Sequence, residues 1–189
     1  ALSMEGWADG TTGVIGGAKD HSSANRQRLP RPDCYQMLCC GRNRLDDGAV
    51  DATVAGIREL YNPQARATGV TGVVAFNGRQ FVQLIEGPRD GVETMFNTLR
   101  TIAGHSEATH IVNRPVGYAD CWDWSVVNIA PDSLASRLLA LALSAALDGS
   151  NGHIARLTWF MVGLEGTEQG AGFGARLLAP HQRTITGYP

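Results

Sequence analysis

The sequence predicts an α+β fold, a ferredoxin-like sandwich in which one sheet lies between two layers of helices. Short β-rich runs alternate with segments of helical spacing in the order β-α-β-β-α-β-β, which places two helices on one face of the sheet. A strongly apolar helix is then predicted over 134–147 and a second short helix over 153–164. Because a helix that is apolar almost all round must be buried, we expect these C-terminal helices on the other face of the sheet.

Size and composition fit one globular domain with extensions. The chain has 189 residues, of which 43% are hydrophobic and 18% are charged, so it can bury a core without disulfides or metals. A formal net charge of −2 argues against a nucleic-acid binder that relies on general electrostatics. The longest apolar run is too short to span a bilayer and no secretion signal is recognisable, so we expect a cytoplasmic protein with no membrane partner.

Three regions are expected along the chain. Residues 1–32 show no helix or strand period and are rich in Gly, Ser and Asn, which predicts a flexible N-terminal arm. Residues 33–130 contain the alternating pattern and form the predicted folded domain. Residues 131–189 combine the helical cap with a Gly-rich stretch from Glu165 onward, which predicts a flexible tail.

The first strand and the first helix follow from one apolar run and one helical stripe. Residues 34–40 read CYQMLCC, a strand-like run that ends at Gly41. Apolar residues at helical spacing follow and predict a helix over 48–62. Pro63 lies where this helix is expected to end, because proline disrupts a helix interior.

A β-hairpin is the strongest local prediction. Two β-rich runs, 70–76 and 79–87, are joined by Asn77-Gly78, a dipeptide that favours a type I′ turn. The second run carries apolar groups on both faces, so it predicts a central strand that is covered on both sides. One of these faces includes Gln83, an amide whose burial is costly unless it is hydrogen-bonded.

One helix and two strands complete the domain. Residues 89–102 carry a single apolar stripe and predict a helix. Residues 109–117 and 122–129 are β-rich and predict the last two strands. Trp122 and Trp124 are two residues apart in the final run, so we expect them on one face of that strand.

The cysteines and histidines predict no metal site. The four cysteines form no C-x-x-C pair, and the five histidines add no ligand at a usable spacing. Without a recognisable secretion signal, the cysteines are expected to be reduced, buried thiols.

Several of these strand motifs resemble the BLUF family, whose members sense blue light with FAD. The resemblance is carried by CYQML at 34–38, by GVTGVV at 69–74 and above all by FVQLIEG at 81–87. A further match is the aromatic and Trp-Ser motif WDWSV at 122–126. The resemblance covers residues 34–130 and implies a ferredoxin-like fold that holds a flavin ring between its two helices.

The resemblance implies a light-driven hydrogen-bond switch. It gives Tyr35 the role of the redox-active phenol that donates an electron and a proton to excited flavin, and Gln83 the role of the amide that then rearranges. It places Trp124 near the flavin. No hydrolytic chemistry is needed, so the protein is expected not to be an enzyme. Its signal would pass to an unknown downstream protein or through a homo-oligomer.

Other candidate flavin-binding residues lie near the ends of the two predicted helices. Beside Tyr35 and Gln83, the candidates are Asn62, Arg66, Arg100 and His105.

The chain also departs from the family pattern. The family's asparagine at the end of the first helix corresponds to Ala65, and of its Asp-x-Arg-His segment only His105 is retained. An alternative hypothesis is therefore a flavin-free BLUF-like module that acts in regulation or protein interaction.

Overall fold

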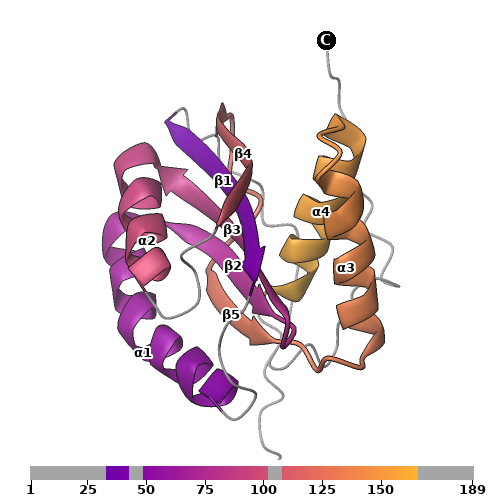
Figure 1. Cartoon of the computed structure of the whole chain (residues 1–189). Coiled ribbons are helices and arrows are strands. Elements are labelled where there is room, and N and C mark those ends of the chain that lie inside the picture. Colours follow the sequence, from indigo (N-terminus) through magenta and orange to yellow (C-terminus); the bar gives the residue numbers. More distant parts are fainter. Residues whose placement is uncertain (1–32, 43–48, 102–107, 166–189) are drawn as a thin grey trace, which may run out of the picture.

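The computed structural model describes residues 33–42, 49–101 and 108–165, and these form one five-stranded sheet with helices on both faces (Figure 1). The strands are β1 (Cys34–Arg42), β2 (Thr71–Phe76), β3 (Gln80–Pro88), β4 (Thr109–Val116) and β5 (Trp124–Asn128). The helices are α1 (Val50–Thr68), α2 (Arg89–Thr101), α3 (Leu134–Ala146) and α4 (Asn151–Leu164). None of the helices described here is both long enough and apolar enough to cross a membrane.

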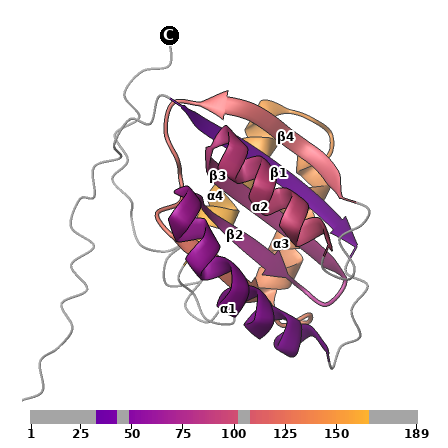
Figure 2. The same ribbon diagram turned by 90° about the vertical axis from the view of Figure 1, so that its left-hand side faces the viewer.

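The sheet has the strand order β4-β1-β3-β2-β5. β2 and β5 pair in parallel, and the other neighbouring strands pair antiparallel. Figures 1 and 2 show α1 and α2 on one face of this sheet and α3 and α4 on the other. The predicted ferredoxin-like α+β fold and the predicted position of the C-terminal helices are therefore confirmed.

Each face of the sheet has its own hydrophobic core, and β3 contributes to both. Phe81 and Ile85 pack under α1 and α2, whereas Val82 and Leu84 pack under α3 and α4. All four side chains are fully buried, and burial of each large apolar side chain stabilises the fold by about 1.5–3 kcal/mol. The prediction of a central strand with two covered faces is confirmed.

The predicted hairpin between β2 and β3 is confirmed, but its turn is centred one residue later than expected. Phe76 lies opposite Phe81, and the N–H of Asn77 donates to the carbonyl of Gln80 at 3.1 Å. The Asn77 side-chain oxygen accepts the N–H of Gln80 at 2.9 Å, so Asn77 caps the turn instead of occupying its centre. Gly78 takes the positive φ of 81° that the turn requires.

The prediction that α1 ends at Pro63 is wrong. Pro63 is exposed inside the helix, which continues to Thr68. Tyr61 and Ala65, on either side of the proline, are both buried, so packing of the following turn outweighs the lost N–H hydrogen bond. The helix ends where Gly69 adopts a left-handed φ of 67°.

Gly72 on β2 is a position where a side chain is not tolerated. Its φ is 154°, and an added Cβ would lie 2.1 Å from the carbonyl oxygen of Leu84. Gly72→Ala is expected to lower the free energy of unfolding by about 3 kcal/mol or more, because the two backbones would have to move apart. Urea denaturation measures this change.

Gly56→Ala is the matched control for Gly72→Ala. Gly56 lies within α1, and an added Cβ would meet no atom within 4 Å. This substitution is expected to raise the stability by about 0.5–1 kcal/mol, because alanine restricts the unfolded chain and favours the helix. Equal stabilities of the two variants would contradict the close strand contact at Gly72.

Candidate functional site

A buried polar pair occupies the middle of the sheet face that α1 and α2 cover. Cys39 on β1 lies directly opposite Gln83 on β3, and the Cys39 thiol donates to Oε1 of Gln83 at 3.4 Å. Gln83 is 1% exposed and Cys39 is fully buried. Burial, together with the neighbouring Cys40, raises the pKa of the Cys39 thiol, so it remains a neutral hydrogen-bond donor. The amide that the sequence singled out is thus buried and hydrogen-bonded.

Tyr35 lies on the same face but away from this pair. β1 and β3 are neighbours as expected, yet their register places Tyr35 opposite Gly87. Cys39 lies four residue steps after Tyr35, a distance of about 13 Å along the strand. The Arg89 guanidinium lies 5.3 Å from the centre of the Tyr35 ring, at the start of α2. The structure does not bring the phenol and the Gln83 amide together.

Trp124 and Asn62 contribute two buried polar atoms that have no partner within the described residues, Nε1 of the indole and Oδ1 of the amide. Leaving such an atom unpaired costs about 1–3 kcal/mol, unless a ligand or water satisfies it. Trp124 is 6% exposed and packs in the core under α1 and α2.

Arg58 fixes the level at which α1 lies on β5. Its guanidinium donates to the carbonyl of Val126 at 3.0 and 2.6 Å, which fixes α1 on β5. β5 runs parallel to β2, and α1 leads back into β2, so α1 and β5 are antiparallel. Four residues after Arg58 the helix has advanced by about 6 Å, and two residues before Val126 the strand lies about 6.6 Å away in the same direction. These steps end at Asn62 and Trp124.

The unpaired polar atoms of Asn62 and Trp124 are of the kinds that hydrogen-bond to a flavin ring. The Asn62 oxygen is an acceptor and the Trp124 indole N–H is a donor, and both kinds of group pair with the polar edge of a flat heterocycle that carries its own N–H and C=O groups. The methyl group of Ala65, at the position of the family's asparagine, is fully buried. Asn62, about one turn earlier, supplies the only buried side-chain amide oxygen without a hydrogen-bond partner among the described residues.

The other candidate flavin-binding residues do not lie together. Arg66 is exposed in the last turn of α1, and Arg100 is exposed in the last turn of α2. α1 and α2 run in opposite directions across the sheet (Figure 2), so the two arginines lie at opposite ends of the layer. His105 lies outside the described residues.

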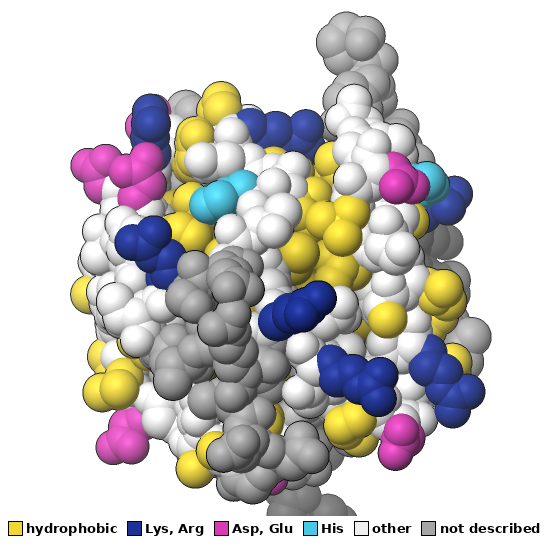
Figure 3. Space-filling view, in the orientation of Figure 1, with side chains coloured by type: hydrophobic (Ala, Val, Ile, Leu, Met, Phe, Trp, Pro, Cys, Tyr) yellow, Lys and Arg dark blue, Asp and Glu magenta, His cyan; other side chains and the backbone are white. Residues whose placement is uncertain are grey.

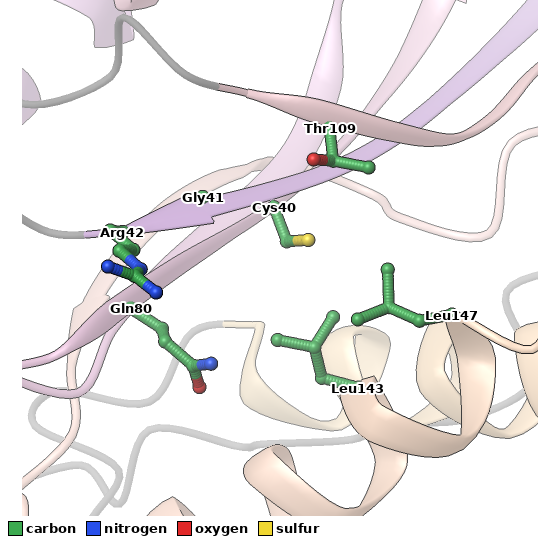
Figure 4. Close-up of a pocket in the computed structure, with 7 residues that line it drawn as sticks. All are labelled: Cys40, Gly41, Arg42, Gln80, Thr109, Leu143 and Leu147. Carbon is green, nitrogen blue, oxygen red and sulfur yellow. The ribbon is translucent and has the colours of Figure 1, made fainter.

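Two cavities lie on the other side of the sheet. One, of about 380 Å³, lies between the sheet and α3, where Cys40 points from β1 toward Leu143 and Leu147 (Figure 4). Figure 3 shows apolar side chains at the surface between the sheet and α3. The second cavity, of about 500 Å³, lies between α3 and α4. Because Gln83 faces α1 and α2, neither cavity is the predicted flavin site.

Glu86 lies on the same strand as Gln83, and its importance was not predicted from the sequence. It is fully buried on the α3/α4 side of β3, and its Oε1 accepts from Nε2 of Gln36 at 2.7 Å. Its Oε2 accepts the backbone N–H groups of Asp120 and Cys121 at 2.7 and 2.8 Å. An acidic residue within an otherwise apolar central strand was the available signal, but its partners are distant in sequence.

Glu165 corrects two expectations from the sequence. It was expected to begin a flexible tail, but it is 9% exposed and directly follows α4. Its Oε1 accepts the N–H groups of Trp122 and Asp123 at 2.6 and 2.5 Å. The second expectation concerned Trp122. It lies in the segment before β5 and is exposed, so it does not share a strand face with Trp124.

Comparison with known proteins finds one family model that matches part of the chain and solved structures that share its fold. Residues 42–126 match the family model BLUF, described as sensors of blue light using FAD. The chain is 25% identical to BlrB, a BLUF protein solved in its dark state, over 69% of this chain and 96% of that chain, with a TM-score of 0.52. A structure of BlsA in its photo-activated state is 12% identical, covers 68% and 94% of the two chains and has a TM-score of 0.56. Among curated proteins, none matches the sequence.

Proposed function

We propose that the chain is a BLUF-type blue-light sensor that uses FAD, because residues 42–126 match the family model and BlrB shares the fold. The observation that carries the proposal is the amide of Gln83, buried at the centre of the α1/α2 face and hydrogen-bonded to Cys39. An amide in this position has no evident role in packing, and it can both donate and accept hydrogen bonds.

The proposed signal is a turn of the Gln83 side chain. Bound flavin would supply the blue absorption and an excited state that accepts an electron and a proton. Tyr35 is the donor that the resemblance implies, and Tyr61 and Trp124 are two further redox-active aromatics in the same core. A turned amide would present its Nε2 in place of its Oε1 to Cys39, so the hydrogen bond between β1 and β3 would change.

Asn62 is proposed to take the place of the missing family asparagine. Asn62→Ala is expected to lower the affinity for FAD about tenfold, because one ring hydrogen bond is lost. In the absence of flavin, the same substitution is expected to raise the stability by about 1 kcal/mol, because an unpaired buried acceptor disappears. Flavin titration and urea denaturation measure the two effects.

Asn97→Ala is the matched control for Asn62→Ala, because Asn97 is exposed on α2. It gains the same helix propensity without touching the site. FAD affinity that is equal in Asn62→Ala and wild type would exclude Asn62 from the flavin site.

We propose a homo-oligomer that forms through the outer surface of α3 and α4. Leu141 and Trp159 are exposed there, beside an apolar groove of about 500 Å³. Leu141→Glu is expected to shift the protein to monomers, because a charge would have to be buried at the interface. Leu60→Glu on α1 is the control, since Leu60 and Leu141 are 69% and 68% exposed. A wild-type monomer in analytical ultracentrifugation would contradict this proposal.

A flavin-free regulatory module is the second candidate function. The observation that favours it is the packing between the helices and the sheet, where Ala65, Met95 and Leu99 are fully buried. A flavin ring between α1 and α2 would have to displace some of these side chains. A chain that stays colourless with added FAD would support this second function over the first.

A further inference from the structure

The strongest unexplained feature is a run of carboxylate contacts just before β5. Five successive backbone N–H groups, in the segment 120–124, donate to side-chain carboxylates. Glu86 from β3 accepts the first two and Glu165 from the end of α4 accepts the next two. Asp123 accepts the fifth, the N–H of Trp124, at 2.8 Å. Hydrogen bonds to charged acceptors are about twice as strong as neutral ones, so this segment is held firmly.

These contacts join parts of the protein that lie on opposite faces of the sheet. Trp124 packs in the core under α1 and α2, whereas α4 packs on the other face (Figure 1). Glu165 directly follows Leu164, the last residue of α4, and its own N–H donates to the carbonyl of Val162 at 3.2 Å. One buried side chain therefore links the final turn of α4 to the two residues that precede Trp124.

We propose that Glu165 is a latch that couples the position of Trp124 to the order of the last turn of α4. Movement of Trp124 shifts the adjoining backbone and withdraws the two N–H groups that Glu165 accepts. The Glu165 carboxylate then loses these two hydrogen bonds and the end of α4 loosens. Glu165 is thus a positioning residue. Its use as the exit route for a light signal rests on the proposed function, but the latch itself exists in the dark and without flavin.

Amide hydrogen exchange on the full flavin-free chain, in the dark, tests the latch. Trp124→Phe is expected to speed exchange in 158–164 about tenfold relative to β1 and β3, although Trp124 lies on the other face of the sheet. Glu165→Ala is expected to speed exchange in 158–164 and at residues 122 and 123. In the double variant, Trp124→Phe is expected to add no further increase at 158–164, because the latch is already open.

Two controls make the result decisive. Glu59→Ala removes an exposed carboxylate of α1 and is expected to leave exchange in 158–164 unchanged. Glu165→Gln keeps an acceptor oxygen without the charge and is expected to give an intermediate increase, which preserves the test if Glu165→Ala fails to fold. Unchanged exchange in 158–164 in Trp124→Phe, or additive increases in the double variant, would overturn the latch. Because no flavin is present, failure of the proposed light-sensing function leaves this result unaffected.

Discussion

Glu86→Ala is expected to destabilise the protein by about 3–5 kcal/mol, because it leaves two buried donors and one partly buried donor without this acceptor. These are Nε2 of Gln36 and the backbone N–H groups of Asp120 and Cys121. The Gln36 and Cys121 donors are buried with Glu86, so water cannot readily replace the lost carboxylate there. Urea denaturation, monitored by circular dichroism, measures the loss.

Glu86→Gln is the control, and it also tests the charge. Burial raises the pKa of the Glu86 carboxyl above its ordinary value of 4.5, and hydrogen bonds from Cys121 and Gln36 oppose part of that rise. A raised pKa in the folded state contributes stability that is fully present below pH 4.5 and is lost as the pH rises through the folded pKa.

Glu86→Gln should therefore be much milder than Glu86→Ala and should remove this pH dependence. The amide keeps one acceptor for the backbone N–H groups, and the Gln36 amide can turn its oxygen toward it. If Glu86→Gln and Glu86→Ala lose equal stability, or if the pH dependence above 4.5 is the same as in wild type, the account of the buried carboxylate fails.

Gln83→Leu is expected to retain flavin and to abolish the light-induced spectral shift completely. Leucine has nearly the volume of glutamine, so the core remains filled, but the hydrogen bond to Cys39 is lost and no amide remains to turn. Absorption spectra before and after blue light measure the shift. Gln80→Leu is the matched control, because Gln80 lies at the start of the same strand and is partly exposed.

Tyr35→Phe tests the donor separately from the amide. Phenylalanine has no hydroxyl proton, so this variant is expected to bind flavin without a light-induced shift if Tyr35 is the donor. A retained shift would exclude Tyr35 and leave Tyr61 and Trp124 as the redox-active aromatics of this core. Because Tyr35 lies away from Cys39 along β1, this variant tests whether a phenol at that distance from the Cys39–Gln83 pair can serve as the donor.

The fold could be predicted from the sequence because its signals are local. The apolar runs, the Asn77-Gly78 turn and the two faces of β3 each depend on a few neighbouring residues. Gln83 was found for the same reason, as one polar residue on an apolar strand face.

The partners within the site could not be predicted, because they depend on register and on distant contacts. The run CYQMLCC is compatible with several pairings, and only the observed one places Cys39 opposite Gln83. Glu165 looks like part of a Gly-rich tail, and its burial arises from N–H groups 42 and 43 residues away. α1 continues past Pro63 because of tertiary packing, which cannot be predicted from the neighbouring residues alone.

An absorption spectrum of the purified protein with added FAD, in the dark and after blue light, tests the central claim most directly. The proposed function predicts the blue absorption band of bound oxidised flavin and its reversible shift to longer wavelength after illumination. A protein that stays colourless, or that binds flavin without any light-induced shift, would contradict light sensing through Gln83. In that case the BLUF domain of this chain serves another regulatory use.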